Sequence, residues 1–395
     1  MEIKRVLHRI YHREYFWLCL IVAVTLSLHF YIIDNPPQLV LDEQHYVNDA
    51  KNIMEKHETL RPEHPPLGQL IFVTGIKLFG DKPLGWRFFP IVFGTISIAL
   101  FYLLCRRLEM SRTAASLATF LLAFENLTFL QASVAMLDVF YLTFMVASFL
   151  FYINRRYITS GISGGLSALA KLNGALAMPT IIIHWLCSRQ GRSRWFLLTL
   201  LFAPLTFVEL MILLDFAIVQ RFTAFIDPIT RIKTMLSLSG TLTFGTVSHP
   251  SISRPWEWLI FYRSMPYWFT PHYTGAISFS IWALIVPVFA YMVFRAVRGS
   301  EAGLFGAAWF TGTYLVWIPI SLITDRATYI YYFYPTIGAI CIGLGLGLSR
   351  LIDIYRGRRA GKLKWTMLSI VLFYLIVHAV SFIILSPVFP VKLPG

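Results

Sequence analysis

Charged residues are scarce in this chain: Asp, Glu, Lys and Arg make up only 14% of its 395 residues. Hydrophobic residues account for 57% and aromatic residues for 16%, and the mean hydropathy is +0.64. This balance excludes a soluble globular protein, because a soluble domain of this length exposes far more polar surface. The composition therefore indicates a polytopic membrane protein.

Cysteine is scarce as well. The four cysteines all lie inside apolar stretches or near the ends of such stretches: Cys19, Cys105, Cys187 and Cys341. None falls in a segment that we expect outside the cell. The sequence therefore indicates no disulfide, no zinc site and no thiol nucleophile.

Acidic residues are outnumbered, since 20 Asp and Glu stand against 34 Lys and Arg, and the formal net charge is +14. In a soluble protein, this excess and the pI of 9.7 would suggest nucleic-acid binding. In a membrane protein the excess is explained by orientation and by anionic lipid headgroups. We expect membrane lipid, and no nucleic acid, among the partners.

Long apolar runs dominate the sequence, and they approach or exceed the ~20 residues that a helix needs to cross ~30 Å of hydrocarbon. They predict an all-α fold. The fifth run has basic clusters at both ends, so we expect two short crossings that turn at 170–174, which gives about eleven membrane helices. The predicted runs are Phe16–Ile33, Phe88–Cys105, Thr113–Gln131, Leu137–Ile153, Ser160–Cys187, Trp195–Ile218, Ala276–Val297, Gly303–Ile323, Tyr329–Leu348 and Trp365–Leu385.

The distribution of basic residues predicts which helix ends face the cytoplasm. The segments assigned to the inside hold about 20 of the 34 Lys and Arg and about 5 of the 20 Asp and Glu. This places the N-terminus inside and the C-terminus outside. We interpret Met1–Tyr15, which precedes the first apolar run, as the start of an uncleaved signal anchor. The inside segments are 1–15, 106–112, 154–157, 188–194, 295–301 and 350–364.

Two outer segments are long enough to build a site, 34–87 and 220–274. In the first, polar and apolar residues alternate at helical spacing over Asn48–His57 and Leu67–Phe79, which predicts amphipathic helices on the membrane surface. The chain thus divides into an N-terminal transmembrane module, an outer loop and a C-terminal four-helix region, which are residues 1–219, 220–274 and 275–395.

The most informative feature of the first outer segment is the acidic pair Asp42-Glu43. It is followed about twenty residues later by the segment His64–Gly68, which reads His-Pro-Pro-Leu-Gly. Carboxylates beside a membrane are rare unless they have a function. Such a carboxylate can act as a base. Alternatively, the pair caps the helix that starts near Gln44.

Five motifs together resemble the protein O-mannosyltransferases of the GT-C glycosyltransferase superfamily. The resemblance covers most of the chain, and it is most specific in the acidic pair with His-Pro-Pro-Leu-Gly at this spacing. It implies the GT-C fold and mannose transfer from a polyprenyl- or dolichyl-phosphate donor to Ser or Thr of exported proteins. The motifs are Leu41–Tyr46, His64–Gly68, Gln131–Asp138, Lys171–Gly174 and Ser253–Trp258.

The chain also departs from this family. The loop 220–274 leaves no room for the soluble outer domain of the fungal and animal enzymes, so the chain resembles the compact prokaryotic form, a protein of the plasma membrane. The family usually has Lys where Gln69 stands and Arg where Ser133 or Val134 stands. Phosphate contacts expected from those positions must come from other residues.

Sugar transfer to a hydroxyl requires a base for the acceptor and charge stabilisation for the leaving phosphate. Asp42 is the candidate base, and Glu43 holds the acceptor or tunes Asp42. The resemblance implies a β-linked donor and an α-linked product. Such inversion occurs in one displacement, so one carboxylate suffices.

Six further residues are candidate substrate-binding residues. Among them the basic residues suit the donor phosphate. Each also has a structural alternative: a helix cap, a stiff turn, local ion pairing or an arginine that snorkels to the interface. The six residues are His64, Asp138, Lys171, Arg254, Glu257 and Arg326.

No cofactor is required by this chemistry. Carboxylates are present without a paired Asp-x-Asp array, so no metal site is predicted, and a divalent cation stays open as an alternative. Three other functions remain: a GT-C transferase acting on a lipid or wall-polymer acceptor, a transporter, and an assembly factor without activity. A transporter would need polar lining on both sides of the membrane, whereas the polar residues here gather in outer loops.

Overall fold

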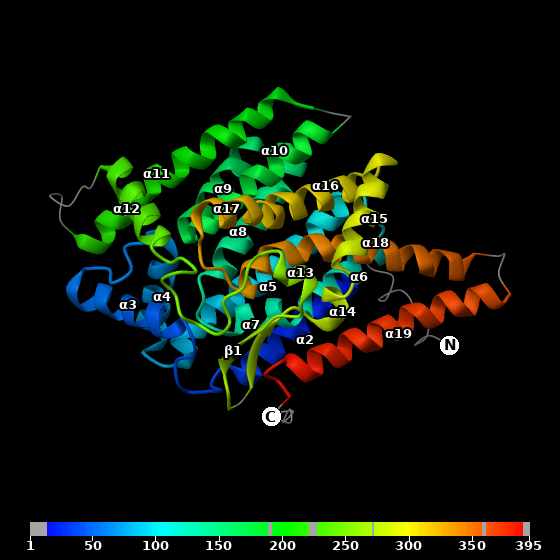
Figure 1. Cartoon of the computed structure of the whole chain (residues 1–395), viewed down its shortest axis with the longest axis horizontal. Helices are drawn as coiled ribbons and strands as arrows, with labels where there is room; N and C mark the ends of the chain where they lie inside the picture. Colours follow the sequence, from blue (N-terminus) through cyan, green and yellow to red (C-terminus); the bar gives the residue numbers. More distant parts are fainter. Residues whose placement is uncertain (1–13, 189–191, 221–226, 271, 358–360, 390–395) are drawn as a thin grey trace.

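The structure is a computed structural model of the chain, and it describes residues 14–188, 192–220, 227–270, 272–357 and 361–389. Long helices lie roughly side by side in a bundle (Figure 1). The predicted all-α fold is confirmed. Most of the basic segment Met1–Tyr15 lies outside the described residues.

The N-terminal part of the chain is helical almost throughout. Every apolar run predicted in this part forms helix, with bounds within a few residues of the prediction except where a run is broken. The elements are α2 (Phe16–Ile32), α3 (Glu43–Lys56), α4 (Pro66–Phe79), α5 (Pro83–Arg107), α6 (Arg112–Ala123), α7 (Asn126–Ser133), α8 (Asp138–Ile153), α9 (Tyr157–Ala170), η1 (Leu172–Leu176), α10 (Ala177–Cys187), η2 (Arg194–Phe196) and α11 (Leu197–Val219).

The C-terminal part adds a small antiparallel hairpin that the sequence did not predict. Its strands β1 (Ser264–Trp268) and β2 (Tyr273–Ala276) pair Ser264 with Ala276. The other elements are α12 (Pro228–Gly240), α13 (Glu257–Ile260), α14 (Phe279–Trp282), α15 (Ile285–Val297), α16 (Glu301–Phe310), the π-helical turn η4 (Thr311–Leu315), α17 (Trp317–Thr324), η5 (Ile330–Thr336), α18 (Ile337–Arg356) and α19 (Lys362–Leu385).

Within the described residues, five helical stretches are long and apolar enough to cross a membrane. A sixth is obtained if α6 and α7, which meet at 58°, form one span. Several shorter apolar helices, such as α8 and α15, accompany them. The protein is therefore an integral membrane protein, and the number of about eleven crossings stays a prediction. The five stretches are Pro83–Arg107, Arg194–Val219, Glu301–Thr324, Ile330–Arg356 and Lys362–Leu385.

The break predicted inside the fifth apolar run is present. Helix α9 ends at Ala170, Lys171 is extended (φ −160°, ψ 139°), and η1 leads into α10. A Cβ on Gly174 would lie 2.2 Å from the carbonyl oxygen of Ser167. Only glycine therefore allows the chain to fold back this closely. The Ser167 hydroxyl donates to the Tyr141 carbonyl at 2.7 Å, which fixes the break against α8.

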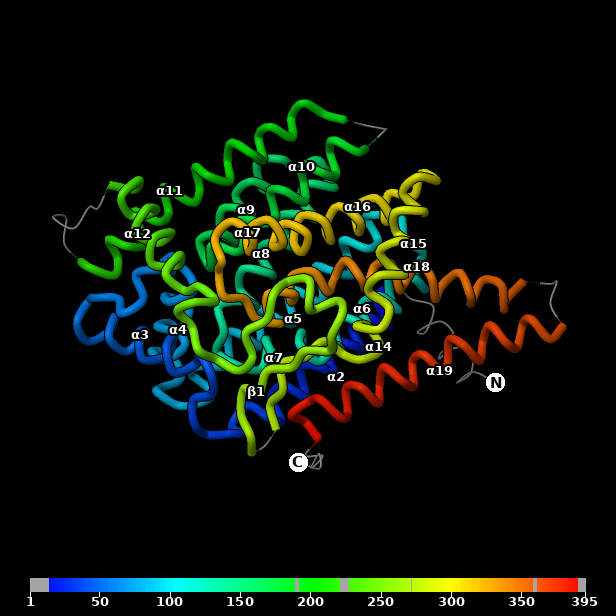
Figure 2. Tube along the Cα trace, viewed as in Figure 1, coloured from blue at the N-terminus to red at the C-terminus, as the bar shows by residue number. Residues whose placement is uncertain are grey.

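The two ends of the bundle differ. Helices α3, α4 and α12 lie at one end, on the left in Figure 1. The end where α10 leads to α11 and α18 leads to α19 lies away from them. Figure 2 shows α2 and α19 along the same lower flank, and Ile32 and Phe382 share one apolar cluster there. The amphipathic helices predicted in the first outer segment are confirmed as α3 and α4, and α3 buries Tyr46, Val47 and Ile53.

Gly68 brings three of the sequence motifs together at the α3–α4 end. A Cβ on this glycine would lie 2.4 Å from Leu137 Cδ2 and 2.8 Å from the carbonyl oxygen of Ala170. Leu137 directly precedes Asp138, and Ala170 directly precedes Lys171. The first turn of α4 thus packs directly against both motifs, because glycine has no side chain to keep them apart.

The close contact of Gly68 with Leu137 and Ala170 predicts that adding a methyl group at residue 68 lowers the stability of the protein. We expect Gly68→Ala to lower the stability by about 1–3 kcal/mol, because an overpacked contact forces backbone shifts. The measurement is thermal unfolding of the purified protein in detergent. Gly240→Ala is the matched control, since a Cβ there meets no atom within 4 Å. Equal unfolding temperatures for the two variants would contradict the tight packing at Gly68.

Candidate active site

A buried ion pair organises the segment that carries the acidic motif. Glu43 and Arg87 are 0% and 1% exposed, and their side chains form two parallel hydrogen bonds, Nε to Oε1 at 2.9 Å and Nη2 to Oε2 at 2.8 Å. Glu43 also accepts the backbone N–H groups of Val40 at 2.9 Å and Ala135 at 2.7 Å. Each carboxylate oxygen therefore has two donors, and Glu43 ties the start of α3 to α5 and to the α7–α8 turn.

The hydrogen-bond donors of Arg87 likewise all have acceptors. Besides Glu43, its guanidinium donates to the carbonyl oxygens of Ile33 at 2.9 Å, Pro36 at 2.8 Å and Gln38 at 3.0 Å. These bonds use all five N–H groups of the side chain. The chain between α2 and α3 is thus wrapped around one buried guanidinium. The Glu43 carboxylate is directed into this network and is closed off from solvent.

Asp42, the neighbour of Glu43, has the opposite environment. Its side chain is half-buried, and its carboxylate makes no hydrogen bond or ion pair with any residue that the structure describes. Burial raises the pKa of Asp42 above its usual value, and the positive charges of Lys171, His45 and Arg61 act against this rise. The capping alternative is not realised, because the Asp42 side chain accepts no N–H from α3.

Asp138 and Lys171 form the second charged pair of the site. Lys171 Nζ lies 2.7 Å from Asp138 Oδ2, and the two side chains are 10% and 1% exposed. Asp138 Oδ1 is buried and has no hydrogen-bond partner among the described residues. Lys171 Nζ also lies 5.6 Å from the centre of the Tyr331 ring. The negative charge of Asp138 contributes to the raised pKa of Asp42, so this pair and Asp42 belong to one site.

His64 lies among basic groups. Burial and, to a smaller extent, the charges of Lys171, Arg61, Arg326 and His45 together lower the pKa of His64 to about 3. The imidazole is therefore neutral at physiological pH. Its ring contacts Tyr46 edge-on, with 5.5 Å between the ring centres. The structure thus brings Asp42, His64, Asp138, Lys171 and Arg326 together.

Arg254 lies in a different arrangement. Its Nη2 donates to Asp325 Oδ1 at 2.6 Å, its Nη1 donates to Ser321 Oγ at 3.2 Å, and its guanidinium lies 3.7 Å from the centre of the Phe244 ring. Ser253 N donates to the Thr328 carbonyl at 2.9 Å. These contacts hold the Ser-Arg-Pro-Trp-Glu-Trp segment against the end of α17.

Glu257 and Arg326 are likewise in contact with neighbours. Glu257 accepts from Arg263 at 2.5 Å near the surface. Arg326 donates to the carbonyl oxygen of Ser239 and to the Tyr332 hydroxyl at 3.3 Å. Among these two, only Arg326 influences His64 electrostatically. The structure therefore associates Arg326, and not Glu257, with the cluster around His64.

Several residues at this end were missed in the sequence. Arg231 of α12 is 5% exposed, binds Asp215 at 3.0 Å and donates to the backbone carbonyls of Pro62 and His64. It clamps the second outer segment onto the first. No sequence signal pointed to Arg87 or Arg231, because their carboxylate partners Glu43 and Asp215 lie 44 and 16 residues away in the chain.

Tyrosines form one wall near Lys171. The rings of Tyr331 and Tyr332 are stacked with centres 5.1 Å apart, and Tyr329 stacks on Tyr331 at 5.5 Å. For a metal ion, the described residues contain no group of three or more His, Cys, Asp or Glu side chains placed to bind one.

Comparison with known proteins agrees with this picture. Residues 63–218 match the model of the dolichyl-phosphate-mannose-protein mannosyltransferase family. A polyprenol-phosphate-mannose–protein mannosyltransferase of Mycobacterium tuberculosis is 29% identical over 138 residues, which cover 33% of this chain and 26% of that protein. Dolichyl-phosphate-mannose–protein mannosyltransferase 1 of Candida albicans is 26% identical over 226 residues, 49% of this chain and 24% of that protein. The matched part thus spans about a quarter of each relative.

Solved structures show the fold. The chain is similar to the S. cerevisiae protein O-mannosyltransferase Pmt1-Pmt2 complex bound to its sugar donor, with a TM-score of 0.76 at 10% identity over 95% of this chain and 90% of that chain. ArnT from Cupriavidus metallidurans bound to undecaprenyl phosphate gives a TM-score of 0.61 at 18% identity over 95% and 76%. The protein has the GT-C fold, and the predicted resemblance to protein mannosyltransferases is confirmed.

The Glu43–Arg87 pair predicts a large loss of stability when one partner is neutralised. We expect Glu43→Gln to cost about 3 kcal/mol, because it leaves the Arg87 charge buried without its counter-ion. Thermal unfolding in detergent measures the loss. Glu55→Gln, an exposed position on the same helix, is the control and should unfold like the wild type. A Glu43→Gln protein as stable as the control would show that the pair does not hold this segment.

Proposed function

We propose that this protein is a membrane glycosyltransferase that moves a sugar from a polyprenyl-phosphate donor to a hydroxyl acceptor, with Asp42 as general base. The observation that carries the proposal is the unpaired Asp42 carboxylate next to the Asp138–Lys171 pair. The relatives named above are protein mannosyltransferases, which favours mannose as the sugar and Ser or Thr of an exported protein as the acceptor.

The reaction is a single displacement. Asp42 takes the proton of the acceptor hydroxyl, and the hydroxyl oxygen forms a bond to the anomeric carbon. The bond from that carbon to the phosphate oxygen breaks, and the electron pair leaves with the lipid phosphate. The anomeric configuration is inverted, so a second nucleophilic carboxylate is unnecessary. A single catalytic carboxylate agrees with the environment of Glu43, whose two carboxylate oxygens already accept hydrogen bonds within the protein. We assign to Glu43, together with Arg87, the positioning of Asp42.

The leaving phosphate requires positive charge. Lys171, Arg61 and Arg326 supply it around His64, and they act at close range where water is partly excluded. The neutral His64 ring adds a hydrogen-bonding group without adding charge. Asp138 Oδ1, which is buried and unpartnered, accepts a hydrogen bond from a sugar hydroxyl in this arrangement. Arg254 and Glu257 hold the second outer segment in place instead of touching the donor.

The acceptor is the second point of the proposal. A second candidate is transfer to a lipid or wall-polymer hydroxyl, and the fold similarity to ArnT bound to undecaprenyl phosphate supports a polyprenyl-phosphate donor for either acceptor. Both candidates use the same base and the same phosphate site. Following the positive-inside rule, we assign the N-terminus to the cytoplasm and Asp42 to the outer face of a prokaryotic plasma membrane.

Removal of the base tests the mechanism. We expect Asp42→Asn to reduce transfer from a polyprenyl-phosphate mannose to a Ser/Thr peptide by about 10²- to 10⁴-fold, since an amide cannot take the proton. Asp34→Asn, an exposed change in the same segment, serves as the control. Equal thermal unfolding of both variants would exclude misfolding. Transfer by Asp42→Asn within tenfold of the control would remove Asp42 as the base.

The pH dependence offers an independent test. Only the ionised Asp42 can accept a proton, so kcat/KM should fall as the pH drops through the raised pKa of Asp42. Lys171→Met removes a charge that lowers this pKa, so the acid limb should move to higher pH. Asp138→Asn removes a charge that raises it, so the limb should move to lower pH. Shifts in the same direction for both variants would contradict the assignment.

A further inference from the structure

The loop between α3 and α4, residues 57–65, is held by polar side chains of both helices. Asp49, in the middle of α3, is 0% exposed. Its two carboxylate oxygens accept the Thr59 hydroxyl at 3.0 and 3.2 Å, and Oδ1 also accepts the backbone N–H of Leu60. Two consecutive residues of the loop are thereby fixed to α3.

Gln69 of α4 holds the residue that follows them, Arg61. The amide Nε2 of Gln69 donates to the Arg61 carbonyl oxygen at 3.1 Å and to Thr59 Oγ1 at 3.3 Å. Thr59 Oγ1 also accepts the Arg61 backbone N–H at 3.0 Å. The Thr59 hydroxyl thus uses its one donor and both of its acceptor positions. Both backbone polar groups of Arg61 are therefore fixed by this network of Asp49, Thr59 and Gln69.

The Arg61 side chain extends from this fixed backbone to the first turn of α3. Its guanidinium donates to Nδ1 of His45, which follows Asp42 by three residues and hence lies on the same side of the helix. Glu63 lies 3.5 Å from Nη1, and further N–H groups of the guanidinium have no acceptor among the residues that the structure describes. The Arg61 charge acts on both Asp42 and His64.

We propose that Gln69 is a positioning residue, which holds Arg61 so that the guanidinium binds the donor phosphate. The inference rests on the proposed function, in which a phosphate leaves next to Asp42. A guanidinium with free N–H groups can bind two phosphate oxygens at once. A long side chain loses conformational entropy when it binds, and a backbone that is already fixed lowers this cost. Gln69 is 0% exposed, so it acts through Arg61 and not by touching the donor.

Removal of the Gln69 amide should leave the fold intact. Its Oε1 is buried without a hydrogen-bond partner among the described residues, so Gln69→Met removes an unsatisfied acceptor together with the two bonds of Nε2. The Arg61 carbonyl oxygen keeps another donor, the His64 N–H at 3.0 Å. We therefore expect Gln69→Met to unfold at the same temperature as the wild type.

Kinetics with a polyprenyl-phosphate mannose and a Ser/Thr peptide test the proposal. We expect Arg61→Met to raise the KM for the donor about tenfold, as for the loss of one charge-assisted hydrogen bond, and Gln69→Met to cause part of this rise. In the Arg61→Met background, Gln69→Met should add less than about twofold, because it acts only through Arg61. Lys77→Met, which removes an exposed cation of α4, is the control. Losses that multiply in the double variant would overturn the proposal.

The pH profile distinguishes positioning from a merely structural role. The Arg61 charge lowers the pKa of Asp42, so displacement of Arg61 should move the acid limb of kcat/KM to higher pH. Arg61→Met and Gln69→Met should both shift the limb in this direction, and Arg61→Lys, which keeps the charge, should restore it. A limb that stays in place in Gln69→Met would contradict the proposal. The other groups that face Asp42 are unchanged in these variants: His45, Asp138, Lys171 and the tyrosines Tyr46, Tyr267, Tyr329 and Tyr331.

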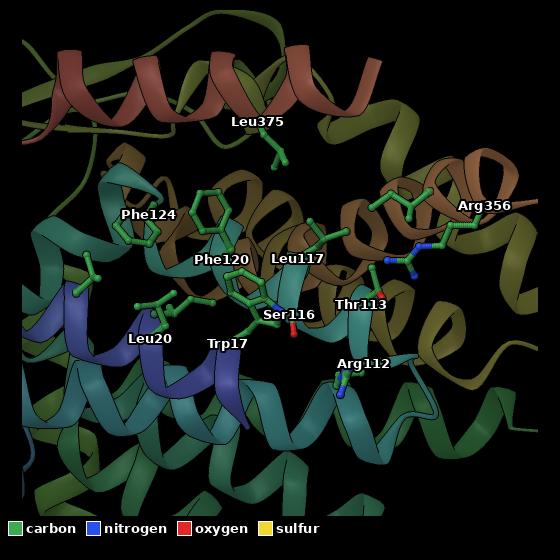
Figure 3. Close-up of a pocket in the computed structure, with 13 residues that line it drawn as sticks. Trp17, Leu20, Arg112, Thr113, Ser116, Leu117, Phe120, Phe124, Arg356 and Leu375 are labelled. Atoms are coloured by element: carbon green, nitrogen blue, oxygen red, sulfur yellow. The ribbon is translucent and has the colours of Figure 1, made fainter. Parts of the chain in front are cut away.

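Hydrogen exchange tests the network without any activity. Thr59→Val removes the hydroxyl that accepts the Arg61 N–H, so residues 59–61 should exchange faster, whereas Thr59→Ser should protect them like the wild type. Thr113 supplies the matched control. It lines a groove of about 550 Å³ between α2, α6, α18 and α19, and this groove shares no lining residue with the network (Figure 3). Thr113→Val should leave the exchange of residues 59–61 unchanged.

The two kinds of measurement separate the network from the transferase activity. A wild-type protein that transfers no sugar would refute the proposed function, and with it the role of Arg61 toward the donor. Faster exchange of residues 59–61 in Thr59→Val and Gln69→Met would still support the network itself. Exchange as slow as in Thr113→Val would overturn it, even if the wild type is an active transferase.

Discussion

The structure around the acidic motif depends on one buried contact, the ion pair between Glu43 and Arg87. Two charges removed from water are tolerated only when hydrogen bonds satisfy all their polar atoms, and here both side chains are saturated. The pair fixes the segment before α3, the start of α3 and the α7–α8 turn relative to one another. Asp42 takes its position from this frame, although it contributes no bond to the frame itself.

Two adjacent carboxylates thus differ completely in environment. The side chain of Glu43 is buried against Arg87, whereas that of Asp42 is half-buried and its pKa responds to the charges of Asp138 and Lys171. Sequence alone could assign both to catalysis, since both are acidic and both lie in the motif. Only the location of Arg87, which is 44 residues away, separates the carboxylate that is held in an ion pair from the one that is not.

The helices were largely predictable because apolar runs of this length have few alternatives in a membrane, and the break at Lys171 followed from the charge pattern at its flanks. The hairpin of β1 and β2 was not predictable, since its aromatic sequence also suits an interfacial loop. Within the candidate site, Asp42, His64, Asp138 and Lys171 were found through motifs. Arg231 was not, because its role comes from partners distant in sequence, and Arg61 was not, although it lies only three residues before His64.

The clamp formed by Arg231 has a consequence for how this protein can change during evolution. Arg231 docks α12 through the backbone carbonyls of Pro62 and His64, and not through their side chains. Carbonyl oxygens are present whatever residue occupies a position. Side chains at positions 62 and 64 can therefore change while Arg231 still joins the two segments through the same carbonyl oxygens.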